Sequence, residues 1–117
     1  MRLASDIWVK AYLRRCAAAG AVCVLARRGD GARGAIYIKV SLLDGTAHLL
    51  QPAPAGLSVG GPVGAEAERR FQASHIAVAE AEIDAFLARQ ADFDPDLWVL
   101  AVEDRSGRHF LDDCLTS

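Results

Sequence analysis

The sequence lacks an apolar run long enough to cross a membrane as a helix. Its longest apolar runs, Ala17–Ala26 and Leu97–Val102, are far shorter than the roughly 18 residues that such a helix needs. Residues 1–6 also lack the basic segment and following apolar stretch that mark an export signal. We therefore expect a cytoplasmic protein that makes no contact with a membrane.

Cysteine is scarce as well. The sequence contains three cysteines, Cys16, Cys23 and Cys114, and no Cys-x-x-Cys spacing. An odd number without that spacing argues against a disulfide framework and against a zinc ribbon. Cys16 and Cys23 fall in apolar patterns, where a free cysteine acts as a small hydrophobic side chain. The histidines, which show no metal-ligand spacing either, are His48, His75 and His109. We accordingly predict no metal and no cofactor.

Charge is present but unevenly distributed. The net charge is −2, yet residues 1–39 contain eight Lys or Arg and two acidic residues, whereas residues 40–117 contain five Lys or Arg and thirteen acidic residues. Such asymmetry is found in proteins that bind nucleic acid or a charged partner. It is also found where two halves of one fold attract each other, so both interpretations stay open.

Two segments have the period of an amphipathic helix. The first spans residues 5–19, with Ser5 as a good N-cap and Gly20 as a natural end. Its apolar face consists of Trp8, Val9, Tyr12, Leu13 and Cys16. The second spans Ala79–Ala91 and is ended by the turn residues Asp94-Pro95-Asp96. Its inward face consists of Ala79, Ile83, Phe86, Leu87 and Gln90.

Three strands are predicted between these helices. They are Ala21–Arg28, Ala35–Ser41 and Thr46–Gln51, joined by Gly29–Gly34 and by the hairpin signal Asp44-Gly45. This order indicates a three-stranded meander, with Gly29–Gly34 as a hairpin loop.

The remaining segments complete the predicted fold. Residues 52–66 are rich in proline and glycine and are expected to form a mobile loop. Residues 67–75 fit either a fourth strand or a helical turn. Leu97–Val102 is a continuous apolar run typical of a strand buried on both faces, and Arg108–Leu111 fits a short edge strand. We expect one α+β domain over residues 1–117, of order α-β-β-β-(β)-α-β-β. It has a mainly antiparallel sheet of four to six strands and both helices on one face.

Two motifs suggest chemistry that their context does not support. Gly29–Gly34 matches the glycine spacing of a dinucleotide-binding loop, but it leads into a strand rather than into a helix. Lys39, with Asp30 upstream, resembles part of a metal-dependent nuclease site. The position that should carry an acidic metal ligand is Tyr37, however, so the site has too few oxygen ligands.

Three functional hypotheses remain, and their balance favours a protein that is not an enzyme. The first is a non-catalytic binding or adaptor domain that uses the basic residues Lys10, Arg14, Arg15, Arg27, Arg28 and Arg33. Its partner is an acidic protein surface or a second copy of the chain rather than nucleic acid. The second is a small hydrolase whose site contains Asp104, Arg105, Arg108 and His109. The third is a structural homo-oligomer.

Several stretches also carry a family resemblance. They are Ser5–Val9, Tyr12–Arg15, Arg27–Asp30, Gly34–Ile36, Asp44–Thr46, Ala88–Val99, Val102–Arg105 and Gly107-Arg108. Together they resemble an uncharacterised family of alphaproteobacterial proteins of about this length, catalogued as a domain of unknown function. The resemblance implies a bacterial cytoplasmic protein of one domain, and it supplies no catalytic residues.

Overall fold

The computed structural model describes residues 3–53 and 69–111. In chain order the elements are α1 (Ser5–Ala18), β1 (Val22–Arg27), β2 (Ile36–Ser41), β3 (Thr46–Pro52), β4 (Phe71–Ala79), α2 (Glu80–Phe93) and β5 (Trp98–Glu103). The α+β class and the predicted element order are confirmed through β5. Residues 108–111 form no strand, which corrects the edge strand predicted there.

The five strands form one mixed sheet of order β1-β5-β2-β3-β4. The β2–β5 pair is parallel and the other three pairs are antiparallel. The predicted meander is therefore right for β2 and β3 and wrong for β1, because β5 lies between β1 and β2. The β5 strand suits this central place, since Trp98, Leu100 and Val102 are buried on one face and Val99 on the other.

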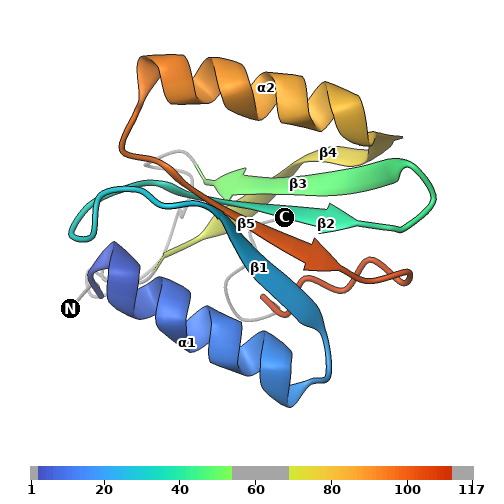
Figure 1. Cartoon of the computed structure of the whole chain (residues 1–117), viewed down its shortest axis with the longest axis horizontal. Helices are drawn as coiled ribbons and strands as arrows, with labels where there is room; N and C mark the ends of the chain where they lie inside the picture. Colours follow the sequence, from blue (N-terminus) through green and yellow to red (C-terminus); the bar gives the residue numbers. More distant parts are fainter. Residues whose placement is uncertain (1–2, 54–68, 112–117) are drawn as a thin grey trace, which may run out of the picture.

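The two helices cover opposite faces of the sheet (Figure 1). On one face, Val9, Tyr12 and Cys16 of α1 belong to the same core cluster as Ile38 of β2 and Leu100 of β5. On the other face, Ile83 and Leu87 of α2 belong to the cluster of Ala47, Leu49 and Val99. The expectation that both helices lie on one face is wrong. The central strands are apolar on both sides, so each face has to be covered.

The Gly29–Gly34 segment is not a hairpin loop, because it carries the chain from β1 past the start of β5 to β2. The Asp30 amide donates to the Asp96 carbonyl over 2.8 Å, and the Trp98 amide donates to the Ala35 carbonyl over 2.7 Å. The Trp98 indole nitrogen donates to the Asp30 carbonyl over 2.8 Å. A Cβ atom at Gly29 or Gly34 would lie only 2.1 or 2.2 Å from the Asp96 carbonyl oxygen. The glycines therefore serve close backbone packing rather than nucleotide binding.

The β4 strand settles an alternative that the sequence left open. Residues 71–75 are strand rather than helical turn, and residues 67–68 lie outside the described residues. The pairing of β4 with β3 is irregular at two places, and Ala77, which lies in the irregularity between His75 and Val78, has a positive φ of 52°. Strand β3 ends at Pro52. Residues 54–66 of the predicted loop lie outside the described residues, and so does Cys114. Neither described helix is long and apolar enough to span a bilayer.

The close passage of the Gly29–Gly34 segment over the start of β5 can be tested by substituting two glycines of that segment. Gly34→Ala should lower the free energy of unfolding by about 2–3 kcal/mol, because the new methyl group meets a backbone carbonyl and the Trp98 ring. Gly31→Ala is the matched control, because its Cβ would lie 3.4 Å from the Asp6 carboxylate, an ordinary contact. Urea denaturation measures both variants. Equal losses of stability would contradict the tight crossing.

Candidate anion-binding site

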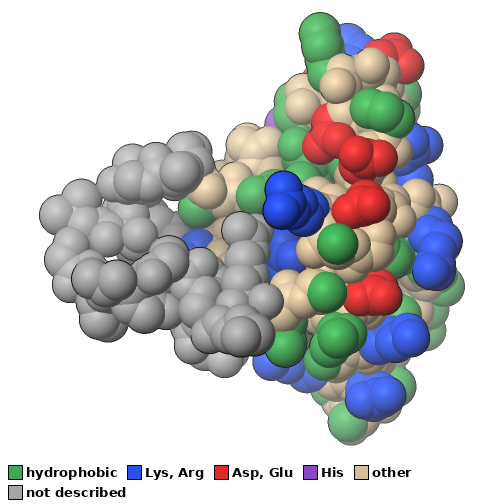
Figure 2. Space-filling view, turned by 90° about the vertical axis from the view of Figure 1, so that its left-hand side faces the viewer, with side chains coloured by type: hydrophobic (Ala, Val, Ile, Leu, Met, Phe, Trp, Pro, Cys, Tyr) green, Lys and Arg blue, Asp and Glu red, His purple; other side chains and the backbone are tan. Residues whose placement is uncertain are grey.

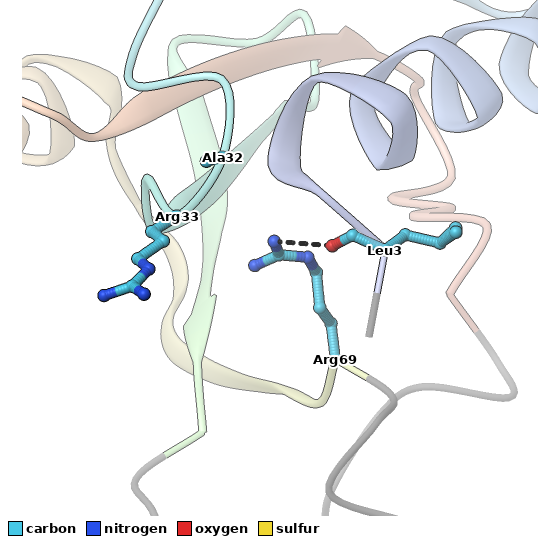
Figure 3. A pocket seen from close by; sticks show the side chains of 4 residues that line it. All are labelled: Leu3, Ala32, Arg33 and Arg69. Carbon is cyan, nitrogen blue, oxygen red and sulfur yellow. Dashed lines mark hydrogen bonds between the residues drawn. The ribbon is translucent and has the colours of Figure 1, made fainter. Parts of the chain in front are cut away.

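A cavity of about 420 Å³ lies at the start of α1. The described residues that line it are Leu3, Ala32, Arg33 and Arg69 (Figure 3). They come from three places in the sequence: the segment before α1, the loop between β1 and β2, and the residues before β4. Long-range packing therefore creates this cavity.

Arg69 supplies a buried positive charge. Only 7% of the residue is exposed. Its Nη2 atom donates to the Leu3 carbonyl over 3.2 Å and to the Ser5 hydroxyl over 2.8 Å. In Figure 3 the guanidinium lies between the Leu3 backbone and the side chain of Arg33. Because arginine stays protonated in proteins, burial leaves the charge in place and removes much of its hydration.

Ser5 positions Arg69 rather than capping α1. The helix has Ala4 at its N-cap, with no side-chain cap hydrogen bond, so the predicted N-cap role of Ser5 is wrong. The Ser5 hydroxyl is fully buried, donates to the Gly34 carbonyl over 2.7 Å and accepts from Arg69. Its oxygen is therefore occupied by the loop and by the arginine. Backbone carbonyls of Gly31 and Ala32 accept the Asp6 and Ser5 amides in place of a side-chain cap.

Asp30 holds the loop that carries Arg33. Its carboxylate accepts the amide of Ala32 over 3.1 Å and the amide of Arg33 over 2.8 Å. The Gly34 amide closes the turn on the Asp30 carbonyl over 3.1 Å. The backbone of Arg33 is thus fixed while its side chain stays exposed beside the cavity. This Asp30 role also differs from the metal-ligand role that the nuclease comparison required.

The chemistry of the cavity favours binding of an anion. Two guanidinium groups can each present paired N–H donors to a carboxylate or a phosphate. The four described lining residues include no side chain of the types that act as nucleophile or general base. Among residues 3–53 and 69–111, no group of three or more His, Cys, Asp or Glu is placed to hold a metal ion. The lining residues therefore suit recognition of a charged group.

The other predicted basic residues are dispersed over the molecule. Three of them bind the chain itself: Arg15 donates to the Phe110 carbonyl, Arg27 donates to the Pro95 carbonyl, and Arg28 lies over the Trp98 ring. Lys10 and Arg14 are exposed on α1. On the side shown in Figure 2, basic side chains lie on either side of a row of acidic ones. Of the six predicted contacts, only Arg33 lines the cavity.

The residues predicted for a hydrolase site do not come together in one place. They are Asp104, Arg105, Arg108 and His109. The Asp104 carboxylate accepts from the Arg108 side chain over 2.8 and 3.1 Å and from the Arg108 amide over 2.7 Å. Arg105 is exposed. His109 lines a separate cavity of about 190 Å³ with His48 and Gly107. Asp104 and Arg108 therefore serve the turn after β5.

Three further residues have shifted pKa values without forming a site. Partial burial lowers the pKa of Lys39, but hydrogen bonds to Asp84 (2.8 Å) and Glu80 (3.1 Å) outweigh that effect, so the pKa is raised. Lys39 thus ties β2 to α2 and does not meet Asp30. Burial raises the pKa of the Cys23 thiol to about 12 and also raises that of Cys16. Both cysteines therefore remain thiols at neutral pH, which disfavours nucleophilic chemistry.

The turn after β5 gives a prediction about acid stability. Hydrogen bonds from Arg108 hold the pKa of the Asp104 carboxyl below its usual range. Because the folded pKa is lowered, the pair stabilises the fold above the unfolded value of about 3.9, and this contribution is lost as the pH falls further. Asp104→Asn should therefore lower stability at pH 6 and reduce the further loss on acidification. Urea titrations across this range measure both effects.

Arg105→Gln is the matched control for that prediction, because Arg105 is an exposed neighbour in the same turn. It should keep the acid dependence of the original chain. If Asp104→Asn shows the same pH profile as the control, the ion pair does not contribute to stability.

The chain is similar in sequence and in fold to proteins of one family. Residues 3–112 match the family described as protein of unknown function DUF1491. A DUF1491 protein from Caulobacter crescentus, known from a crystal structure, is 37% identical to this chain. The match covers 100% of each of the two chains and has a TM-score of 0.78. An NMR structure of a DUF1491 protein from the same organism is 39% identical, with 100% and 99% coverage of the two chains and a TM-score of 0.78.

A third solved structure has the same fold. The solution structure of protein Atu0922 from A. tumefaciens is 39% identical, covers 88% of this chain and 86% of its own, and has a TM-score of 0.74. No match was found among curated proteins. The resemblance to an alphaproteobacterial family is thereby confirmed: the chain belongs to the DUF1491 family, whose function is unknown.

Proposed function

We propose that this protein is a non-catalytic binding domain, and that the cavity beside Arg33 and Arg69 holds an anionic group of its ligand. The observation that carries this proposal is the buried Arg69 guanidinium at a cavity where a second guanidinium is also present. The Leu3 carbonyl and the Ser5 hydroxyl hold this guanidinium at the cavity. A bound carboxylate or phosphate stabilises both arginines and is recognised by them.

The size and lining of the cavity define the ligand further. A volume of about 420 Å³ is within the range of small-molecule sites. Leu3 adds an apolar wall beside the two arginines. We therefore propose a small molecule that carries one carboxylate or phosphate and a short apolar part. The proposed setting is the cytoplasm, with the chain acting as one domain.

This proposal narrows the binding hypothesis drawn from the sequence. A broad basic surface would need Arg15, Arg27 and Arg28 to face a partner, but these side chains contact Phe110, Pro95 and Trp98. Arg33 remains from that set, and Arg69 joins it. Recognition through two arginines requires a localised anion rather than an extended acidic surface.

The proposal predicts saturable anion binding that depends on Arg33. Isothermal titration at low ionic strength, with inorganic phosphate and with succinate in separate arms, distinguishes a phosphate ligand from a carboxylate ligand. Arg33→Gln should weaken binding of the preferred anion about tenfold, because one charge-assisted interaction contributes roughly 1.5 kcal/mol or more. Arg33 is exposed, so this variant should fold normally.

Arg14→Gln is the charge-matched control, because Arg14 is exposed on α1 and does not line the cavity. It should leave the dissociation constant unchanged. Equal weakening by both variants would mean that binding follows net charge alone. Absence of saturable binding for both anions would also overturn the proposal.

A further inference from the structure

The cavity of about 190 Å³ that is lined by His48 and His109, which we call the histidine cavity, contains two imidazoles held by backbone amides. The Nδ1 atom of His48, on β3, accepts the amide N–H of Ala77 over 2.9 Å. The Nδ1 atom of His109, after β5, accepts the amide N–H of Leu111 over 3.0 Å. A ring nitrogen that accepts a hydrogen bond carries no proton, so each neutral ring carries its proton on Nε2. The structure thus provides two Nε2–H donors of fixed tautomer.

Both Nε2–H donors lack a hydrogen-bond partner in the part of the chain that the structure describes. The Nε2 atom of His48 faces Gly107, since a Cβ atom at Gly107 would lie only 2.8 Å from it. Gly107 also has a positive φ of 76°, which favours glycine. Glycine at this position therefore keeps the Nε2 edge of His48 clear of a side chain. A partly buried donor in this state is satisfied by an acceptor that enters the cavity.

The other described residues around the histidine cavity are apolar. Val40 and Leu50 are buried and belong to the core cluster on the α1 face of the sheet. Ala73 and Ile76 of β4 contribute exposed apolar side chains. The described lining residues include no Lys or Arg, so an anion would lose hydration there without gaining a positive partner. This lining therefore favours a neutral ligand, in contrast to the candidate anion-binding site.

The positions of both imidazoles are fixed before any ligand binds. The Tyr12 hydroxyl of α1 donates to the His109 carbonyl, and Leu111 belongs to the core cluster that α1 covers. His109 is thus held through its backbone as well as through its ring. His48 lies within β3 and is held by the Ala77 amide of the neighbouring strand. Donors that are already in place lose little conformational freedom on binding, which favours recognition of a ligand.

We propose that the histidine cavity binds a small, neutral, mainly apolar molecule through a carbonyl oxygen that accepts from the Nε2–H groups of His48 and His109. A carbonyl oxygen has two lone pairs, so it is able to accept both hydrogen bonds. The cavity volume of about 190 Å³ is below the roughly 300–1,000 Å³ of most small-molecule sites, so the ligand has only a few non-hydrogen atoms. The two cavities share no described lining residue, so this proposal is independent of the anion site.

NMR titration of the full chain, labelled with ¹⁵N at histidine, tests the proposal with cyclopentanone as the probe. The Nε2 resonances of His48 and His109 should shift in a saturable way, with a dissociation constant of about 1 mM, because so small a ligand has few contacts. Cyclopentane, the same ring without the oxygen, is titrated in parallel to report on the apolar walls alone. The titration of the unchanged protein tests the cavity without any substitution.

His48→Asn and His109→Asn each remove one donor while keeping an acceptor for the backbone amide. The Oδ1 atom of asparagine lies near the position of Nδ1, but asparagine has no group at the position of Nε2. Each variant should therefore weaken cyclopentanone binding about fivefold more than it weakens cyclopentane binding, because one hydrogen bond to the ligand is lost. The remaining histidine of the cavity reports binding in each variant, and circular dichroism measures whether the variant is folded.

His75→Asn is the matched control, because His75 packs against Phe86 and is not among the described residues that line the cavity. It should leave both dissociation constants unchanged. The proposal is overturned if cyclopentanone causes no saturable shift of the two Nε2 resonances. It is equally overturned if either cavity variant weakens both probes by the same factor, or if His75→Asn weakens cyclopentanone binding as much as they do.

Discussion

The place of β5 between β1 and β2 constrains most of the molecule. It forces the Gly29–Gly34 segment to pass the start of β5 at a distance that leaves no room for a side chain at Gly29 or Gly34. Once it is there, that segment accepts the first amides of α1 and donates to and accepts from the residues around Asp96 and Trp98. The same backbone carries Arg33. The sheet, the start of the helix and the candidate site therefore depend on one crossing.

Local patterns in the sequence predict the elements better than their partners. The period of α1, the turn at Asp44-Gly45 and the apolar run of Leu97–Val102 each have a short-range signature, and each was found as expected. The pairing of β1 was not predictable in this way. Both β2 and β5 offer apolar strands, and the choice between them depends on long-range packing that the sequence of β1 does not encode. The opposite placement of the helices follows from the same cause.

The candidate site was predictable only in part. Arg33 stood among six basic residues, but nothing in the sequence separated it from Arg28, which lies over a tryptophan, or from Arg15, which holds a carbonyl. Arg69 was missed because arginine is normally read as a surface residue. Its burial depends on Ser5, and a serine before a helical pattern normally indicates a cap. A buried hydroxyl and a capping hydroxyl leave the same trace in sequence.

The central position of β5 also determines the order in which the strands can pair during synthesis of the chain. On the ribosome, β1 and β2 emerge long before residues 98–103, yet neither can pair with β5 until those residues have been synthesised. In the nascent chain, β1 and β2 therefore both lack β5 as a pairing partner. The β2–β3 hairpin can form at once, because both of its strands have already been synthesised. Contacts of such long sequence separation slow folding. This architecture thus makes completion of the sheet a late event in biosynthesis, and the β2–β3 hairpin is the part of the sheet that can form first.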